Sequence, residues 1–102
     1  VTRAEALRAY AVLCRRDRNY EQAAAAWQCV IELRRCPTRI VREATEALAV
    51  HHEHRVRDLN AARQFALLAL QFNVSVTRAH GMHHRLARLN RKLGESSGML
   101  GD

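Results

Sequence analysis

Residues that interrupt helices are scarce in this sequence, which has one proline and four glycines in 102 residues. β-Hairpins and β-sandwiches depend on turns that glycine and proline favour, so this scarcity leaves little room for either. Hydrophobic residues make up 48% of the chain, as in folded globular proteins. A chain of this length forms one small domain and not two. The composition therefore predicts a single all-α domain.

The chain also lacks paired cysteines and long apolar runs. Its three cysteines, Cys14, Cys29 and Cys36, cannot all pair with one another, and no two of them form a CxxC motif. We therefore expect a reducing compartment, the cytoplasm, with Cys14 and Cys29 buried on apolar helix stripes. No apolar run approaches the ~20 residues of a membrane helix and no signal segment opens the chain, so we expect no membrane partner. Because the chain starts at Val1 and not at methionine, we also expect a piece of a longer protein.

Motifs of known catalytic chemistry are missing from the sequence. There is no GxSxG nucleophile turn, no phosphate-binding loop and no glycine-rich turn after a strand. The acidic residues are spread singly along the chain, whereas catalytic carboxylates must meet in one cleft. We therefore expect a protein that is not an enzyme and that holds no cofactor.

Two groups of histidines have to be weighed as metal ligands. In residues 51–54, adjacent side chains of a helix point about 100° apart, so only His51 and His54 could share a face. A metalloprotease helix has two histidines four residues apart, and this spacing does not occur in residues 51–54. His52 is expected to pack between helices. In the second group His80 and His84 are four apart and could bind a transition metal, but two ligands make a weak site. We expect no metal.

Apolar residues recur at spacings of three and four along most of the chain, which is the pattern of amphipathic helices. Thr2, with Glu5 three residues later, is typical of a helix start. Pro37 ends the second helix because proline cannot donate the next backbone hydrogen bond. The spacing predicts five helices over about residues 2–16, 20–35, 38–55, 59–72 and 76–93. Residues 94–102 contain three glycines and two serines, so we expect a domain over 1–93 and a flexible tail over 94–102.

The largest apolar side chains on these helices define the expected core, which consists of Leu13, Tyr20, Trp27, Leu48, Phe65, Phe72 and Leu86. Alanines recur beside them, four in a row at residues 23–26, where small side chains let another helix come close. The short connections between helices then predict helical hairpins packed around this core.

Part of the sequence repeats at an offset of 39 residues. Segments 17–23 and 56–62 each end a helix, pass through a polar turn and place a large apolar residue three positions before an alanine. Beyond them Val30 matches Ala69, and Trp27 matches Ala66 with a change from large to small. The pattern predicts two copies of one helical hairpin.

These features resemble the tetratricopeptide repeat family, in which each unit is a helix-turn-helix. The first helix of the first unit matches the family's positions at Leu7, Tyr10, Ala11 and Cys14, although Cys14 stands where the family has an aromatic residue. In the second unit these positions fall on Thr45, Leu48, Ala49 and His52 if the turn that follows is one residue longer than usual. The resemblance covers about residues 4–72. It implies two repeat units, a fifth helix that caps them, and a role as a scaffold or protein-interaction module.

A narrower resemblance lies in residues 47–62. This segment is similar to the helical-repeat tail behind the nuclease domain of some bacterial ribonuclease-H-like proteins, where Glu-His-Arg precedes the turn, here Glu53, His54 and Arg55. His51 and His52 stand where that family has two aromatic residues. The acidic metal-binding motifs of the nuclease domain do not occur in the sequence, so the resemblance implies an accessory region of a larger bacterial protein.

In the tetratricopeptide family the first helix of each unit lines an inner face that binds partners. The resemblance maps Glu5 and Glu43 onto this face, together with the expected partner-binding residues Arg8, Val12, Arg15, Arg16, Glu46, Val50, Glu53 and His54. The face would be basic at one end and acidic at the other, which suits an extended peptide that carries both charges. The alternative is that these residues are only the solvated sides of two helices.

A net charge of +7 also permits an anionic partner. The densest basic patch lies on the fifth expected helix and consists of Arg78, Arg85, Arg88, Arg91 and Lys92. Most aromatic residues are assigned to the core, which leaves little for base stacking, so this alternative is a non-specific nucleic-acid-binding accessory domain. An exposed apolar end of the array would instead indicate a homodimer or a missing neighbouring domain.

Overall fold

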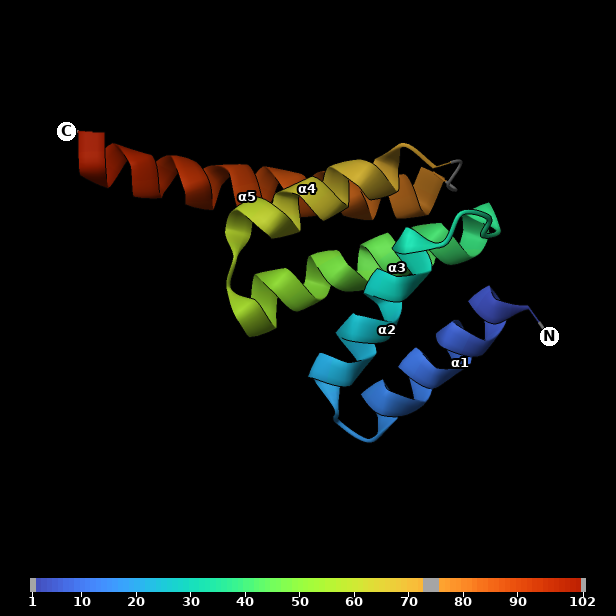
Figure 1. Ribbon diagram of the computed structural model, residues 1–102. Coiled ribbons are helices and arrows are strands. Elements are labelled where there is room, and N and C mark those ends of the chain that lie inside the picture. The colour runs from blue at the N-terminus through green and yellow to red at the C-terminus, as the bar shows by residue number, and fades with distance from the viewer. Residues whose placement is uncertain (1, 73–75, 102) are drawn as a thin grey trace.

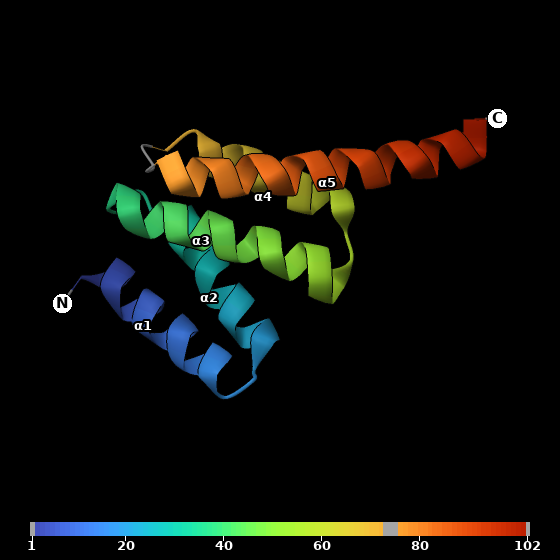
Figure 2. The ribbon, with the colours of Figure 1, turned by 180° about the vertical axis from the view of Figure 1, so that it is seen from behind.

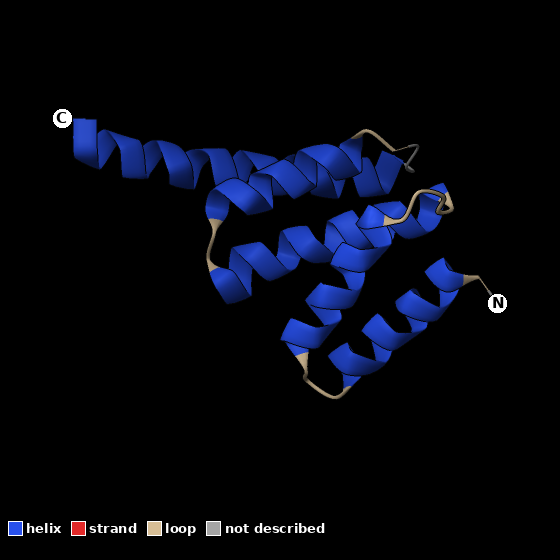
Figure 3. Cartoon of the chain, in the orientation of Figure 1, coloured by secondary structure: helices blue, strands red, loops and turns tan. Residues whose placement is uncertain are grey.

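The computed structural model of the chain describes residues 2–72 and 76–101, and the side chains of residues 76–78 and 95–101 lie outside the described set. In these ranges every regular element is helical and no strand is present (Figure 1 and Figure 3). The elements are α1 (Arg3–Arg16), α2 (Tyr20–Glu32), α3 (Thr38–His51), the π-helical turn η1 (His52–Val56), α4 (Leu59–Leu70) and α5 (Val76–Gly101). The predicted all-α fold is therefore confirmed. Within the described residues, no helix is both long and apolar enough to cross a bilayer.

The helices stack in chain order. α1 packs against α2, α2 against α3, α3 against α4 and α4 against α5, and α1 also touches α3. Figure 1 shows the α1/α2 hairpin at one end of the molecule, α3 in the middle, and α4 beside α5 at the other end. The opposite view in Figure 2 shows the carboxyl end of α5 extending past α4. Two hairpins followed by one further helix is the arrangement that the sequence predicts.

Two helix starts have side-chain caps, and the first is at Thr2 as expected from the sequence. The Thr2 hydroxyl accepts a hydrogen bond from the Glu5 amide at 3.1 Å. The Asp58 carboxylate accepts one from the Ala61 amide, also at 3.1 Å. Each bond satisfies an amide that has no partner within its own helix.

Several helix ends differ from the expected positions, among them those of α2 and α5. α2 ends at Glu32, before the expected residue 35, because the backbone is already extended at Leu33. α5 continues to Gly101, past the end expected at residue 93. Glycine and serine lower helix propensity, but unlike proline they keep the backbone donor that a helix needs. The flexibility expected for residues 94–102 stays a prediction.

The turns of the two hairpins share one backbone conformation. Arg18 and Arg57 both have a φ of 62°, and no other non-glycine residue in the described ranges has a positive φ. The left-handed region costs a residue with a side chain about 1–2 kcal/mol, so its recurrence at one position of both turns marks them as equivalent. Asn19 and Asp58 follow these arginines and precede the second helix of each hairpin. The 39-residue repeat in the sequence is therefore a repeat in the structure.

The second hairpin has one more residue before its turn than the first. In the first hairpin the Asn19 amide donates to the Cys14 carbonyl at 2.7 Å. In the second, the Asp58 amide reaches one residue further back, to the His52 carbonyl at 2.9 Å. The extra residue is accommodated by η1, because a π-helical turn is wider than an α-helical turn. His52 therefore occupies the place of Cys14, as the expected longer turn requires.

The core lies between successive helices. One cluster joins α1, α2 and α3, and a second joins α3, α4 and α5, with alanine as the commonest residue in both. Of the expected core residues, Trp27, Leu48 and Leu86 are buried, whereas Tyr20, Phe65 and Phe72 are half-buried. Small side chains at the contacts allow the helix backbones to lie close together, as the sequence predicts.

The first hairpin leaves an apolar end uncovered. Tyr10 is 49% exposed, whereas Leu48, at the same position of the second hairpin, is 2% exposed because α2 covers it. Leu13 is 53% exposed, so its assignment to the core is wrong. No described helix precedes α1 to bury these side chains. Cys29 is also exposed, contrary to expectation, while Cys14 is buried as expected.

Candidate functional site

The first helices of the two hairpins lie side by side, as the expected partner-binding face requires. Arg8 of α1 donates two hydrogen bonds to the Glu43 carboxylate of α3, from Nε to Oε1 and from Nη2 to Oε2, the latter at 3.1 Å. Of the other residues mapped to this face, Glu5, Val12, Arg15, Arg16, Val50 and His54 are exposed, Glu46 is half-buried and Glu53 is buried. We call the surface formed by Arg8, Val12, Arg15, Arg16, Glu43 and Val50 the α1/α3 face.

Two valines provide the apolar part of the α1/α3 face. Val12 and Val50 occupy equivalent positions of the two first helices and are 38% and 39% exposed. Both lie outside the core clusters, so neither is needed to fill the interior. Arg8 and Glu43 join the two helices, and the two valines lie further along them, toward their carboxyl ends. They can contact apolar side chains of a partner.

The charges on the α1/α3 face differ from the expected arrangement. Glu43 is already paired, Glu46 has an interaction partner, and Glu53 is buried. Arg15 and Arg16 are exposed and form no ion pair with a described residue. The acidic residues of the α3 side are therefore engaged in contacts within the protein or buried. The α1 side ends in two arginines that are free to bind carboxylates.

Glu53 forms the most strongly bonded polar site among the described residues. Its side chain is fully buried, and Arg88 donates to it from Nε to Oε2 at 2.8 Å and from Nη2 to Oε1 at 3.0 Å. Arg85 donates to Oε1 from Nη1. The Lys92 Nζ lies 3.7 Å from Oε2, and the His54 Nε2 lies 3.5 Å from Oε1. We call these five residues the Glu53 cluster.

The electrostatics of the Glu53 cluster strongly favour the ionised carboxylate. The hydrogen bonds from Arg88 lower the pKa of Glu53 to about 2, and the charges of Arg88, Arg85 and His54 act in the same direction. Burial acts in the opposite direction, because it disfavours a charge, but it is the weaker influence. The same hydrogen bonds raise the pKa of Arg88. This carboxylate therefore links the end of α3 to α5 as a permanent ion pair at neutral pH.

The Glu53 cluster changes the interpretation of the basic patch on α5. Arg85, Arg88 and Lys92 contact Glu53, while Arg91 is exposed and the side chain of Arg78 lies outside the described residues. The patch is therefore not a row of free cations. The cluster differs from the expectation that Glu53 lies on the partner-binding face. The sequence does contain a signal for the cluster. Each of the three cations that contact Glu53 stands directly before an apolar residue of α5, and therefore beside the side of the helix that packs on the core.

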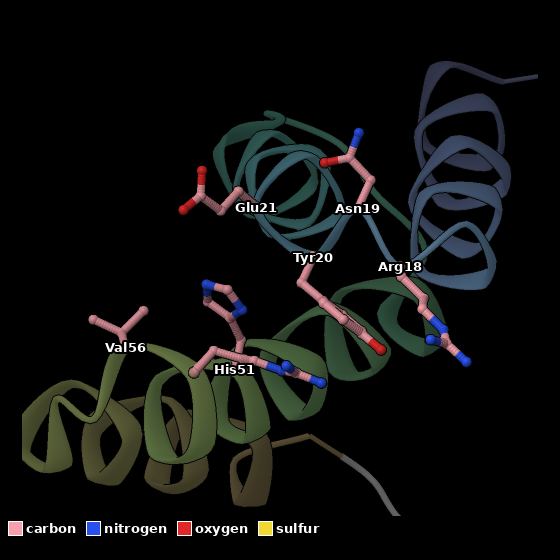
Figure 4. A pocket seen from close by; sticks show the side chains of 7 residues that line it. Arg18, Asn19, Tyr20, Glu21, His51 and Val56 are labelled. Carbon is pink, nitrogen blue, oxygen red and sulfur yellow. The ribbon is translucent and has the colours of Figure 1, made fainter.

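A shallow hollow of about 410 Å³ lies where the turn of the first hairpin meets the end of α3. The guanidinium carbon of Arg55 is 3.7 Å from the centre of the Tyr20 ring, a cation–π contact. Figure 4 shows His51 pointing from α3 toward α2 beside Tyr20. Burial lowers the pKa of His51, with a further lowering from His52 and Arg55 and an opposing effect from Glu21. The ring is therefore neutral over most of the physiological pH range.

The described residues contain no group of three or more histidine, cysteine, aspartate or glutamate side chains that could hold a metal ion. His52 instead stacks on Phe65, with the ring centres 5.2 Å apart and the planes at 10°. No protein family, curated protein sequence or solved structure matches this chain. Its function therefore has to be inferred from the arrangement of its own residues.

Proposed function

We propose that the protein is a non-catalytic interaction module of tetratricopeptide type, which binds an extended acidic segment of a partner protein on the α1/α3 face. It would act in the cytoplasm as part of a larger bacterial protein, as the resemblances imply. The three free thiols support a reducing location. The exposed end at Tyr10 and Leu13 would receive a neighbouring domain or a second copy.

The observation that carries this proposal is the equivalence of Val12 and Val50. Two side chains at the same position of successive hairpins have almost the same exposure and are not used by the core. An extended peptide that crosses both first helices would meet an apolar contact at each. Arg15 and Arg16 follow on α1, and an arginine guanidinium can bind a carboxylate through two parallel hydrogen bonds. These features favour a partner with apolar and acidic residues.

The affinity of such a site is modest. Covering the exposed part of a valine side chain contributes about 0.5–1 kcal/mol, so both valines together contribute about 1–2 kcal/mol. The ordering of an extended peptide opposes binding. Replacing both valines with serine should therefore weaken binding by about tenfold.

The proposal can be tested by fluorescence anisotropy with three labelled nine-residue peptides. One alternates leucine with aspartate and glutamate, the second has serine in place of leucine, and the third has lysine in place of the acids. We expect the first to bind most tightly, and the Val12→Ser/Val50→Ser double variant to bind it about tenfold more weakly. Leu67→Ser is the matched control, because Leu67 is 39% exposed on α4, which does not contact α1.

Equal binding of the acidic peptide by the wild type and the double variant would contradict the proposal. A titration with labelled duplex DNA at low and moderate salt tests the alternative, a nucleic-acid-binding accessory domain that uses α5. DNA binding that weakens steeply with salt, together with no peptide binding, would favour that alternative. Arg91→Ala is the variant for that case, since Arg91 is exposed and is not part of the Glu53 cluster.

A further inference from the structure

Two histidines on the exposed side of α5 have no part in the core, the α1/α3 face or the Glu53 cluster. His80 and His84 are both exposed and lie one helical turn apart. Their rings meet edge to face with their centres 4.5 Å apart. The Nε2 atom of His80 is 3.0 Å from the Nε2 atom of His84. The two outer ring nitrogens therefore lie within hydrogen-bond distance of each other.

The separation between these nitrogens fits a metal ion bound to both. A histidine nitrogen binds a first-row divalent metal at about 2.0–2.1 Å, so nitrogens 3.0 Å apart would subtend an angle of about 94° at the ion. This is close to the angle between neighbouring ligands in the square-planar or octahedral sites of Cu²⁺ and Ni²⁺. Tetrahedral Zn²⁺ would need the nitrogens about 3.3 Å apart.

The core fixes the backbone that carries the two histidines. Met82 and Leu86 lie on the opposite side of this part of α5 and pack into the cluster formed with α3 and α4. Without an ion, the short distance between the two Nε2 atoms is a hydrogen bond between the rings. A metal would replace this single bond and would not have to reorder the helix. A pair that is already in place loses little conformational entropy on binding.

We propose that His80 and His84 form a two-histidine site for a divalent transition metal, with Cu²⁺ and Ni²⁺ preferred over Zn²⁺. The remaining coordination positions face solvent and are open to water or to a carboxylate of a bound partner. Imidazole nitrogens are poor ligands for Mg²⁺ and Ca²⁺, which prefer oxygen, so these ions are excluded. The site is independent of the partner-binding function proposed above.

Titration calorimetry of the metal-free full chain with NiCl₂ tests this site. Ni²⁺ is the better probe because Cu²⁺ oxidises free thiols, and the protein has three of them. We expect one site in the wild type, and at least a tenfold loss of affinity in both His80→Ala and His84→Ala. His83→Ala is the matched control, because His83 is an exposed neighbour on the same helix and is not in ring contact with the pair. This variant should bind Ni²⁺ as the wild type does.

The variants should all keep their helices, since alanine has the highest helix propensity and the three positions are exposed. Circular dichroism without metal checks this. An unchanged Ni²⁺ affinity in His80→Ala and His84→Ala would overturn the proposal, because the ion would then bind elsewhere. An equal loss of affinity in His83→Ala would also overturn it. Tighter binding of Zn²⁺ than of Ni²⁺ would contradict the stated preference and the geometry behind it.

Discussion

Glu53→Gln isolates the charge of the buried carboxylate while keeping the size of the side chain. The wild-type pKa is lowered from 4.5 to about 2, and a shift of this size corresponds to about 3 kcal/mol of folding free energy at pH 7. The variant also leaves Arg85 and Arg88 without an anion, and breaking a buried ion pair costs about 3–5 kcal/mol in other proteins. We therefore expect the free energy of unfolding to fall by about 3 kcal/mol, a large part of the stability of a small domain.

The pH dependence of this difference provides a sharper test than its size. The pKa of Glu53 is lower in the folded protein than in the unfolded chain, so its contribution is complete above about pH 4.5 and is lost as the pH falls toward 2. The difference in stability between the wild type and Glu53→Gln should be about 3 kcal/mol at pH 7, about half of that at pH 3, and close to zero at pH 2. Urea unfolding followed by circular dichroism at each pH measures it.

Glu43→Gln is the matched control for this experiment. Glu43 also accepts two hydrogen bonds from an arginine of another helix, but the side chains of Arg8 and Glu43 are 42% and 35% exposed. Exposed ion pairs contribute about 0–1 kcal/mol, so this variant should lose less than about 1 kcal/mol. Equal losses in the two variants, or a difference for Glu53→Gln that does not change between pH 7 and pH 3, would refute the reasoning.

Two further predictions concern the hairpin turns. Arg18→Gly and Arg57→Gly should each raise the free energy of unfolding by about 0.5–1 kcal/mol, because glycine adopts a φ of 62° without strain. A lower free energy of unfolding in urea would show that the arginine side chains are needed in these turns. Asp58→Ala should lower the free energy of unfolding by about 1 kcal/mol, because it removes a side-chain cap. Asn19→Ala should change the free energy of unfolding by less than about 0.5 kcal/mol, because Asn19 makes no capping bond. Equal effects of these two changes would contradict the difference between the caps.

The sequence predicts most of the helices and the repeat because both depend on local signals. The caps at Thr2 and Asp58 and the apolar spacing of three and four act within a few residues of one another. The equivalence of Arg18 and Arg57 follows from the same local pattern, since each stands in a polar turn between two helices. The longer second turn was also predictable, because the alignment of His52 with Cys14 requires one additional residue.

The burial of individual residues was less predictable because it depends on what covers each helix. Leu13 lies on a regular apolar stripe, but it is exposed since no described helix packs outside α1. The pattern of the stripe is the same whether or not a neighbour covers it. Glu53 shows the opposite case. An acidic residue near the end of a helix is usually solvated, and only the position of α5 in space shows that two arginines enclose this one.

The extra residue in the second hairpin and the buried carboxylate of Glu53 lie in the same π-helical turn. Within it His52 is half-buried and Glu53 is buried, whereas Arg15, which follows Cys14 in the first hairpin, is exposed.

A buried carboxylate is unfavourable unless cations accompany it. Arg85 and Arg88 of α5 provide these cations for the second hairpin, while in the first hairpin the residue after Cys14 is the exposed Arg15, so no buried carboxylate needs a partner there. α5 is therefore matched to the second hairpin by charge as well as by apolar contacts. The ion pairs with Glu53 therefore add to the apolar contacts by which α5 packs on this end of the array.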